Sequence, residues 1–155
     1  MTGARTLASL RDAIRHLEAQ TMPQQVERGA LGHASADATL QGGLLRGALH
    51  EVFATETRQS ASATGFAAGL VQCLASHRPI FWVQQDFAEA EAGALSMNGF
   101  AELGLDPCRL VLVRVLNAET ALKVTADALA CDALGAVVCE LWGETKTFDL
   151  TASLR

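Results

Sequence analysis

The residues best suited to chemistry lie in one polar loop, residues 54–65, between a short apolar run and a helical stretch. In a parallel sheet, the loop after the first strand commonly binds the ligand. A phosphate-binding loop needs glycines whose backbone N–H groups converge, a lysine for the phosphates and a hydroxyl for magnesium. Thr64 supplies a hydroxyl, but the loop has no lysine and its first glycine is Gly65. We interpret it as a degenerate nucleotide-binding loop in which Arg58 is the one cation able to bind another anion. The candidate residues of this loop are Thr55, Glu56, Arg58, Thr64 and Gly65.

Two carboxylates follow later apolar runs. Asp86 comes after residues 79–84, where a water-activating carboxylate belongs, and Glu140 ends an apolar run as magnesium-binding acids do. Glu140 is followed by Leu and Trp rather than by a second acid, which favours a structural carboxylate at a strand end. Without a phosphate-binding lysine, Asp86 has no chemistry to support. We therefore assign no catalytic residue and expect no cofactor.

The cysteines and histidines form no metal-binding or redox motif. The chain has four cysteines without a CxxC pair, and each lies in an apolar segment where a thiol behaves as a small hydrophobe. The histidines are isolated from one another and have no Cys or carboxylate at ligand spacing. We expect structural roles, and no metal, at Cys73, Cys108, Cys131, Cys139, His16, His33, His50 and His77.

The composition fits one compact domain. The chain has 155 residues, of which 50% are apolar and 19% charged, so it can bury a core. A net charge of −5 argues against a protein held on nucleic acid by charge, so DNA contact is expected to be indirect. No apolar run reaches the roughly 18 residues of a membrane helix, and the N-terminus has no apolar signal core. We expect a cytoplasmic protein without a membrane partner.

Strand-like and helical stretches alternate along the chain. The three later strand-like runs are continuously apolar and rich in β-branched or aromatic residues, as in a parallel sheet covered on both faces. Alternation of strand and helix is the pattern of βαβ crossovers. The sequence therefore predicts an α/β fold with a mainly parallel sheet of at least four strands. The expected strands are 48–54, 79–84, 109–115 and 135–142, and the expected helices are 63–76, 87–103 and 118–132.

An amphipathic helix over residues 7–18 is expected to precede this core. Its apolar stripe, a candidate surface for a partner or for self-association, consists of Leu7, Leu10, Ile14 and Leu17. The polar segment that follows has no sustained period, which is typical of an extended linker. The predicted divisions are an N-terminal helix at 1–22, a linker at 23–38 and a core at 39–155.

Residues 44–52, Leu-Leu-Arg-Gly-Ala-Leu-His-Glu-Val, follow a glycine-rich turn and lead into the first expected strand. This stretch resembles the corresponding one in the ImuA family of RecA-like mutagenesis accessory proteins. Further segments resemble that family in the same order: 63–68 (ATGFAA), 81–83 (FWV), 104–114 (GLDPCRLVLVR), 134–140 (LGAVVCE) and 148–153 (FDLTAS). The resemblance extends over residues 5–155.

The resemblance implies a RecA-like αβα sandwich whose nucleotide motif has decayed. It also implies a non-catalytic role in the SOS response to DNA damage, in error-prone translesion synthesis. The implied partners are an inactive, Y-family-like polymerase subunit and an error-prone replicative polymerase, with RecA as a further candidate. The family pattern continues with more strands, so the core at 39–155 is expected to be incomplete at its C-terminus.

Two other functions remain as alternatives. The first is a SulA-like inhibitor that binds the tubulin-like division protein, which the length of the chain favours and residues 44–52 do not. The second is a cryptic RecA-like ATPase that uses Arg58, Thr64, Asp86 and Glu140. Capture of the division protein tests the first, and a nucleotide titration with magnesium tests the second.

The sheet is expected to have an open edge. RecA-like sheets place a later strand between the first strand and the fourth strand predicted here, and this chain lacks that later strand. Unpaired backbone donors and acceptors beside apolar side chains are a template for another chain. We therefore expect strands 48–54 and 135–142 to pair directly or to be bridged by a partner. The flanking residues are Val52, Phe53, Val138 and Leu141, of which Phe53 and Val138 are the candidate partner-binding residues.

Overall fold

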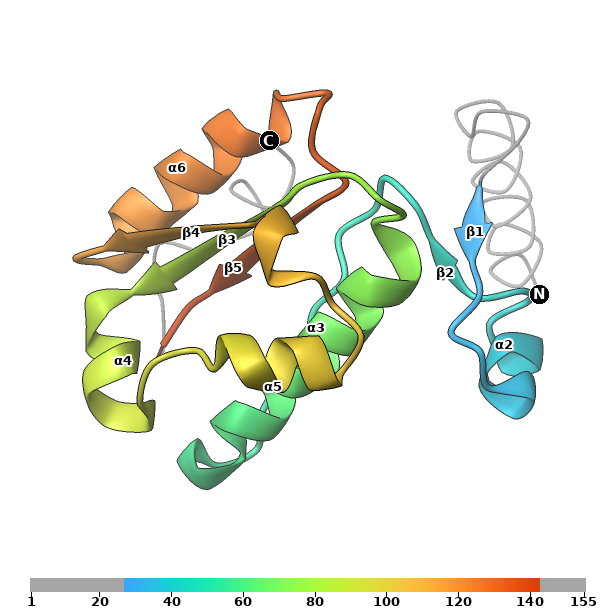
Figure 1. Cartoon of the computed structure of the whole chain (residues 1–155), viewed down its shortest axis with the longest axis horizontal. Helices are drawn as coiled ribbons and strands as arrows, with labels where there is room; N and C mark the ends of the chain where they lie inside the picture. Colours follow the sequence, from blue (N-terminus) through green and yellow to red (C-terminus); the bar gives the residue numbers. More distant parts are fainter. Residues whose placement is uncertain (1–26, 143–155) are drawn as a thin grey trace, which may run out of the picture.

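The computed structural model of the chain describes residues 27–142, which form a three-stranded sheet covered by helices and a separate short ribbon (Figure 1). The elements in chain order are β1 (Arg28–Gly29), α2 (Ala34–Thr39), β2 (Leu44–Leu45), η1 (Thr57–Gln59), α3 (Ser60–Leu74), β3 (Ile80–Gln85), α4 (Asp86–Ala92), α5 (Met97–Glu102), η2 (Pro107–Arg109), β4 (Leu110–Val115), α6 (Ala118–Leu129) and β5 (Ala136–Glu140). The elements η1 and η2 are single turns of 3-10 helix.

The sheet is parallel, with β3 in the middle between β4 and β5. Ile80 at the start of β3 is the register partner of Leu110 on one side and of Ala136 on the other. The predicted α/β class and parallel sheet are therefore confirmed. The predicted number of strands is wrong for the described part of the chain, because residues 27–142 contribute three parallel strands rather than at least four.

Side chains of β3 alternate between two apolar cores. Ile80 and Trp82 are fully buried and pack with Phe100 of α5, whereas Val83 packs with Ala121 of α6. Helix α6 covers one face of the sheet, and α3 and α5 cover the other (Figure 1). This alternation follows from the two-residue period of a strand. It makes the sheet the middle layer of three, an arrangement compatible with an αβα sandwich.

The strand expected at 48–54 does not form. These residues have no regular secondary structure and pair with no strand, and the Phe53 side chain is 80% exposed. Within this segment only Val52 and Phe53 belong to the residue types that favour strands. The His50 ring is instead hydrogen-bonded to the carbonyl oxygen of Leu45, 2.8 Å away, which holds the segment beside the ribbon. Its weak strand propensity and this local contact explain the failed prediction.

The helix expected at 87–103 is two helices, α4 and α5, separated by residues 93–96. Gly93 ends α4 with a φ of 85°, a conformation that glycine adopts without strain. Ser96 begins α5 by accepting a hydrogen bond from the backbone N–H of Gly99 at 3.0 Å. The break lets Leu95 pack against the core beneath α5. The prediction of one helix over 87–103 is therefore wrong, because Gly93 and Ser96 are stop and start signals within an otherwise helix-forming stretch.

The remaining helices agree with their predicted positions. Helix α3 covers most of the expected 63–76, and α6 covers most of the expected 118–132. Asn117 begins α6 by accepting a hydrogen bond from the backbone N–H of Thr120 at 2.9 Å. The expected N-terminal helix at 7–18 lies outside the described residues. Every helix within residues 27–142 is too short or too polar to span a bilayer.

Strands β1 and β2 form an antiparallel ribbon that projects from the sheet beside α2 (Figure 1). A Cβ atom on Gly43 would lie 2.0 Å from the carbonyl oxygen of Gly29, and the φ of Gly43 is 114°. Only glycine tolerates both conditions. Just after β2, Arg46 Nη1 donates to the carbonyl oxygen of Leu74 at the end of α3. This contact attaches the ribbon to the layered core.

Replacing Trp82 by alanine is expected to lower the free energy of unfolding by about 3–5 kcal/mol. Trp82 is the largest fully buried side chain, and its ring centroid lies 5.3 Å from that of Phe100. Trp82→Phe should be milder, since no partner within residues 27–142 accepts a hydrogen bond from the indole nitrogen. Phe87, 52% exposed, provides the control: Phe87→Ala should lower it by about 1 kcal/mol or less. Urea unfolding measures all three, and equal losses for Trp82→Ala and Phe87→Ala would contradict this core.

Candidate functional site

The polar residues at the carboxyl ends of β3 and β5 form one hydrogen-bonded cluster. Thr64 Oγ1, in the first turns of α3, donates to Oε1 of Glu140 at the end of β5. Gln84 Nε2, on the neighbouring strand β3, donates to the other oxygen, Oε2, at 2.9 Å. Gln84 and Glu140 are register partners, so the pairing of the two strands places their side chains together. Both carboxylate oxygens of Glu140 therefore accept hydrogen bonds within the protein.

This cluster acts as a clamp between a helix and two strands. Gln84 is 5% exposed, and a buried amide without a partner would destabilise the fold. Glu140 satisfies that amide and at the same time holds α3 against the sheet through Thr64. The structure thus brings together two of the predicted residues, Thr64 and Glu140, in a contact that stabilises the fold.

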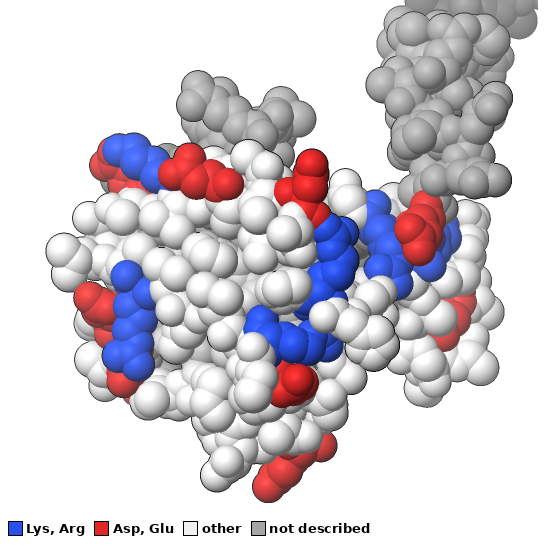
Figure 2. Space-filling model, turned by 45° about the horizontal axis from the view of Figure 1, so that its top comes forward, with Lys and Arg blue, Asp and Glu red and all other residues white. Residues whose placement is uncertain are grey.

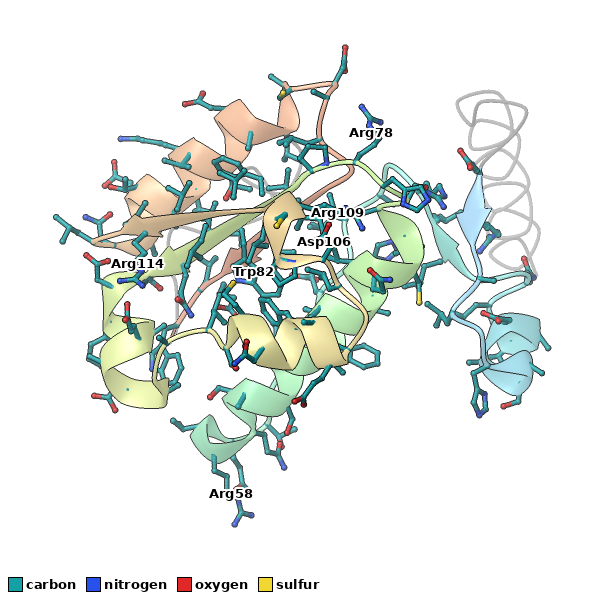
Figure 3. All side chains as sticks on the ribbon, in the orientation of Figure 1. Arg58, Arg78, Trp82, Asp106, Arg109 and Arg114 are labelled. Atoms are coloured by element: carbon teal, nitrogen blue, oxygen red, sulfur yellow. The ribbon has the colours of Figure 1, made fainter. Side chains whose placement is uncertain are left out.

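The other residues of the predicted loop lie away from this cluster. Arg58 forms an exposed ion pair with Glu56 and points away from the sheet beyond the start of α3 (Figure 3). Thr55 Oγ1 donates to Gln59 Oε1 at 2.6 Å. A Cβ atom on Gly65 would meet no atom within 4 Å, so no close approach of the backbone requires this glycine. The side chains of this loop form a hydrogen bond and an ion pair with one another, and they do not converge on one ligand position.

The other charged residues near this end of the sheet do not join the cluster. Asp86 is exposed at the start of α4. At the end of β4, Arg114 Nη1 lies 2.6 Å from Oε2 of Glu89 on α4, so a carboxylate neutralises this cation. Figure 3 shows Arg114 beside α4, at the same end of the sheet. Within residues 27–142 no group of three or more His, Cys, Asp or Glu residues is arranged to hold a metal ion.

Sequence reasoning missed the two consecutive glutamines at the end of β3. Gln84 supports Glu140, and Gln85 Oε1 accepts a hydrogen bond from the backbone N–H of Trp142 at 2.8 Å. Gln85 is 9% exposed, so it too is a buried polar group with a partner. The signal in the sequence was an amide pair closing an otherwise apolar strand, where the polar atoms must find hydrogen bonds.

The cysteines divide into two kinds. Cys139 on β5 packs against the α6 side of the core. Burial raises the pKa of its thiol; a hydrogen bond with Thr125 lowers this pKa in part, and the negative charge of Glu140 raises it further. A raised pKa keeps the thiol protonated, which fits the predicted packing role. The same prediction is wrong for the exposed Cys73, Cys108 and Cys131, whose apolar neighbours in sequence belong to elements with a solvent-facing side.

The predicted partner-binding residues have different surroundings. Phe53 is 80% exposed, as a contact residue requires. Val138 is partly buried and packs beneath α3 with the core that contains Trp82, so its side chain is not presented at the sheet edge. The apolar stripe predicted at Leu7, Leu10, Ile14 and Leu17 lies outside the described residues.

An apolar hollow lies between the ribbon and α3, and Val52, the residue before Phe53, is part of its lining. It has a volume of about 200 Å³. Phe66 of α3, 58% exposed, and Val52 stand at its margin, and Leu49 nearby in sequence is 61% exposed. The full lining consists of Leu31, Leu40, Leu44, His50, Glu51, Val52, Phe66 and Leu70. Large apolar side chains exposed together on one surface are typical of protein contact sites.

Comparisons with known proteins returned no match: no family model matches the chain, nor does any curated protein or solved structure.

Glu140→Ala is expected to lower the free energy of unfolding by about 1–3 kcal/mol, because it leaves the buried Gln84 amide without its partner. Glu56→Ala is the control, since Glu56 is exposed and should change stability by less than about 0.5 kcal/mol. Urea denaturation of both variants checks this. A loss no larger for Glu140→Ala than for Glu56→Ala would show that the clamp does not stabilise the fold.

Proposed function

We propose that this chain is a non-catalytic, RecA-like accessory protein of the SOS DNA-damage response, which joins protein partners in error-prone translesion synthesis. The partners are a Y-family-like polymerase subunit and an error-prone replicative polymerase, with RecA as a further candidate. The proposal is supported by the ordered resemblance of residues 44–52 and the later segments to the ImuA family. The helix-covered parallel sheet is compatible with that architecture.

The observation that carries the non-catalytic part is the hydrogen bonding of Glu140. A magnesium-binding carboxylate at this position needs oxygens available to the ion and its water ligands. Here Thr64 and Gln84 each donate to one oxygen of Glu140. Arg58 is paired with Glu56 beyond the start of α3 and is not directed at this carboxylate. This arrangement favours a structural use of the residues that a nucleotide site would require.

Two features support a role in protein contacts. In the described part of the chain β5 pairs only with β3, so one edge of the sheet offers backbone donors and acceptors to another strand. Phe66 exposes a large apolar area at the hollow on α3, and Leu49 and Phe53, which flank the lining residues 50–52 in sequence, are also exposed. Aromatic side chains of this kind anchor protein interfaces.

ATP with magnesium is expected not to stabilise the protein. A ligand at a hundred times its dissociation constant would add about 2.7 kcal/mol to the free energy of unfolding, which thermal melting detects easily. Sulfate serves as the control for a general anion effect at Arg58. A saturable rise in Tm with ATP, but not with sulfate, would contradict the non-catalytic proposal and support the cryptic ATPase.

Phe53→Lys is expected to weaken binding of the Y-family-like polymerase subunit by at least about tenfold, because it removes an exposed aromatic anchor. Phe87→Lys is the matched control: Phe87 is also exposed but lies on α4, away from the hollow. Binding titrations with the purified subunit measure both. Equal weakening by the two variants would argue against the Phe53 surface, and binding of the tubulin-like division protein instead would favour the SulA-like alternative.

A further inference from the structure

Three arginines surround the loop between α3 and β3, at the amino end of the sheet. Arg46 Nη1 lies 3.5 Å from Ser76 Oγ in this loop, and Arg78 belongs to the loop itself. Arg109 stands at the start of β4 and donates to the backbone of Arg78. Figure 3 shows Arg78 and Arg109 together, at the opposite end of the sheet from Arg114. In the space-filling view, basic side chains gather on this face, with acidic side chains at the margins of the group (Figure 2).

Backbone carbonyls hold these guanidinium groups in place. Arg109 donates from Nε and Nη2 to the carbonyl oxygen of Arg78, at 3.2 and 2.8 Å. Arg78 donates from Nε to the carbonyl oxygen of Ala133 at 3.3 Å. A guanidinium has five N–H donors, so most of those on Arg78 remain available. Its rigid fork suits the paired oxygens of a phosphate, and little side-chain entropy is lost on binding.

Two of the three arginines have no ion-pair partner among residues 27–142. Arg58, Arg114 and Lys123 each pair with a carboxylate elsewhere. Within residues 27–142, Arg78 and Arg109 have no such pair, and Arg46 has one with the exposed Glu27, at 3.4 Å. Asp106, the nearby acid before η2, accepts a hydrogen bond from the backbone N–H of Cys108 at 2.9 Å. Arg78 and Arg109 are therefore two cations without an ion-pair partner among the described residues, in a chain whose net charge is −5.

The polar groups among these arginines favour a phosphate backbone over an acidic peptide. Ser76 and His77 are exposed in the same loop, and Ser, His and Arg side chains are typical contacts to phosphate oxygens. A peptide interface needs a buried apolar anchor at its centre. The loop of residues 75–79 contributes no large exposed apolar side chain to such an anchor.

We propose that Arg46, Arg78 and Arg109 form a site that binds the phosphate backbone of DNA without reading its sequence. This goes beyond the indirect DNA contact expected from net charge, and the site lies at the other end of the sheet from Glu140. It does not depend on the Phe53 surface, so either proposal can fail alone. Because each arginine that contacts a phosphate releases condensed counterions from the DNA, binding is strongest at low ionic strength.

The test uses the full chain and a labelled mixed-sequence DNA duplex at low salt. Arg78→Gln and Arg109→Gln should each weaken binding roughly three- to tenfold and reduce the slope of log affinity against log salt by about one. Arg114→Gln, which makes the same charge change at the other end of β4, should leave both unchanged. Arg78→Lys should recover part of the affinity, and a thermal melt establishes that each variant is folded.

Three results would overturn the proposal. The first is a wild-type chain that does not bind the duplex at low salt. The second is an Arg114→Gln variant that weakens binding as much as Arg78→Gln, which would reduce the effect to net charge. The third is displacement of the duplex by polyglutamate at equal charge concentration, with the same dependence on Arg78, which would identify an acidic protein segment as the ligand.

Discussion

Because β3 is paired on both sides within residues 27–142, its backbone sets the position of nearly everything else that the structure describes. The register that joins Ile80 to Leu110 and to Ala136 also brings Gln84 beside Glu140. The side chains of β3 point alternately to the two faces of the sheet, where one set packs against α6 and the other against α3 and α5. A shift of one residue would turn Trp82 from its core toward α6 and separate the polar cluster, so fold and site share one constraint.

The sequence was sufficient for the elements whose apolar pattern is continuous. The segments that form β3, β4 and β5 are bounded by turn residues and rich in residues that favour strands. In these segments the local strand propensity and the pairing within the sheet agree. The strand prediction for residues 48–54 is wrong because a segment of weak strand propensity forms a strand only beside a pairing partner. Local sequence does not show whether such a partner is present. The break at Gly93 was predictable from its glycine and the Ser96 cap, yet the apolar content of residues 87–103 outweighed both.

The candidate site was predictable by residue type but not by role. Thr64 and Glu140 are separated by 76 positions, and only the packing of α3 on β5 makes them partners. The residue type of Gln84 suggests no chemistry, although its burial makes it the residue that most requires Glu140. The amino-end arginines were equally unremarkable in sequence, since Arg46, Arg78 and Arg109 come from three separate segments joined by backbone carbonyls.

The two arginine-bearing ends of the sheet differ in how their cations are held. At the carboxyl end, Arg114 is paired with the carboxylate of Glu89, while Glu140 accepts hydrogen bonds that hold α3 to the strands. At the amino end, carbonyl oxygens fix the guanidinium groups of Arg78 and Arg109 without cancelling their charge. A hydrogen bond to a neutral acceptor orients a cation and leaves its field available to a ligand, whereas an ion pair removes that field. The capacity to bind an anion therefore lies at the end of the sheet where parallel α/β proteins seldom place a ligand.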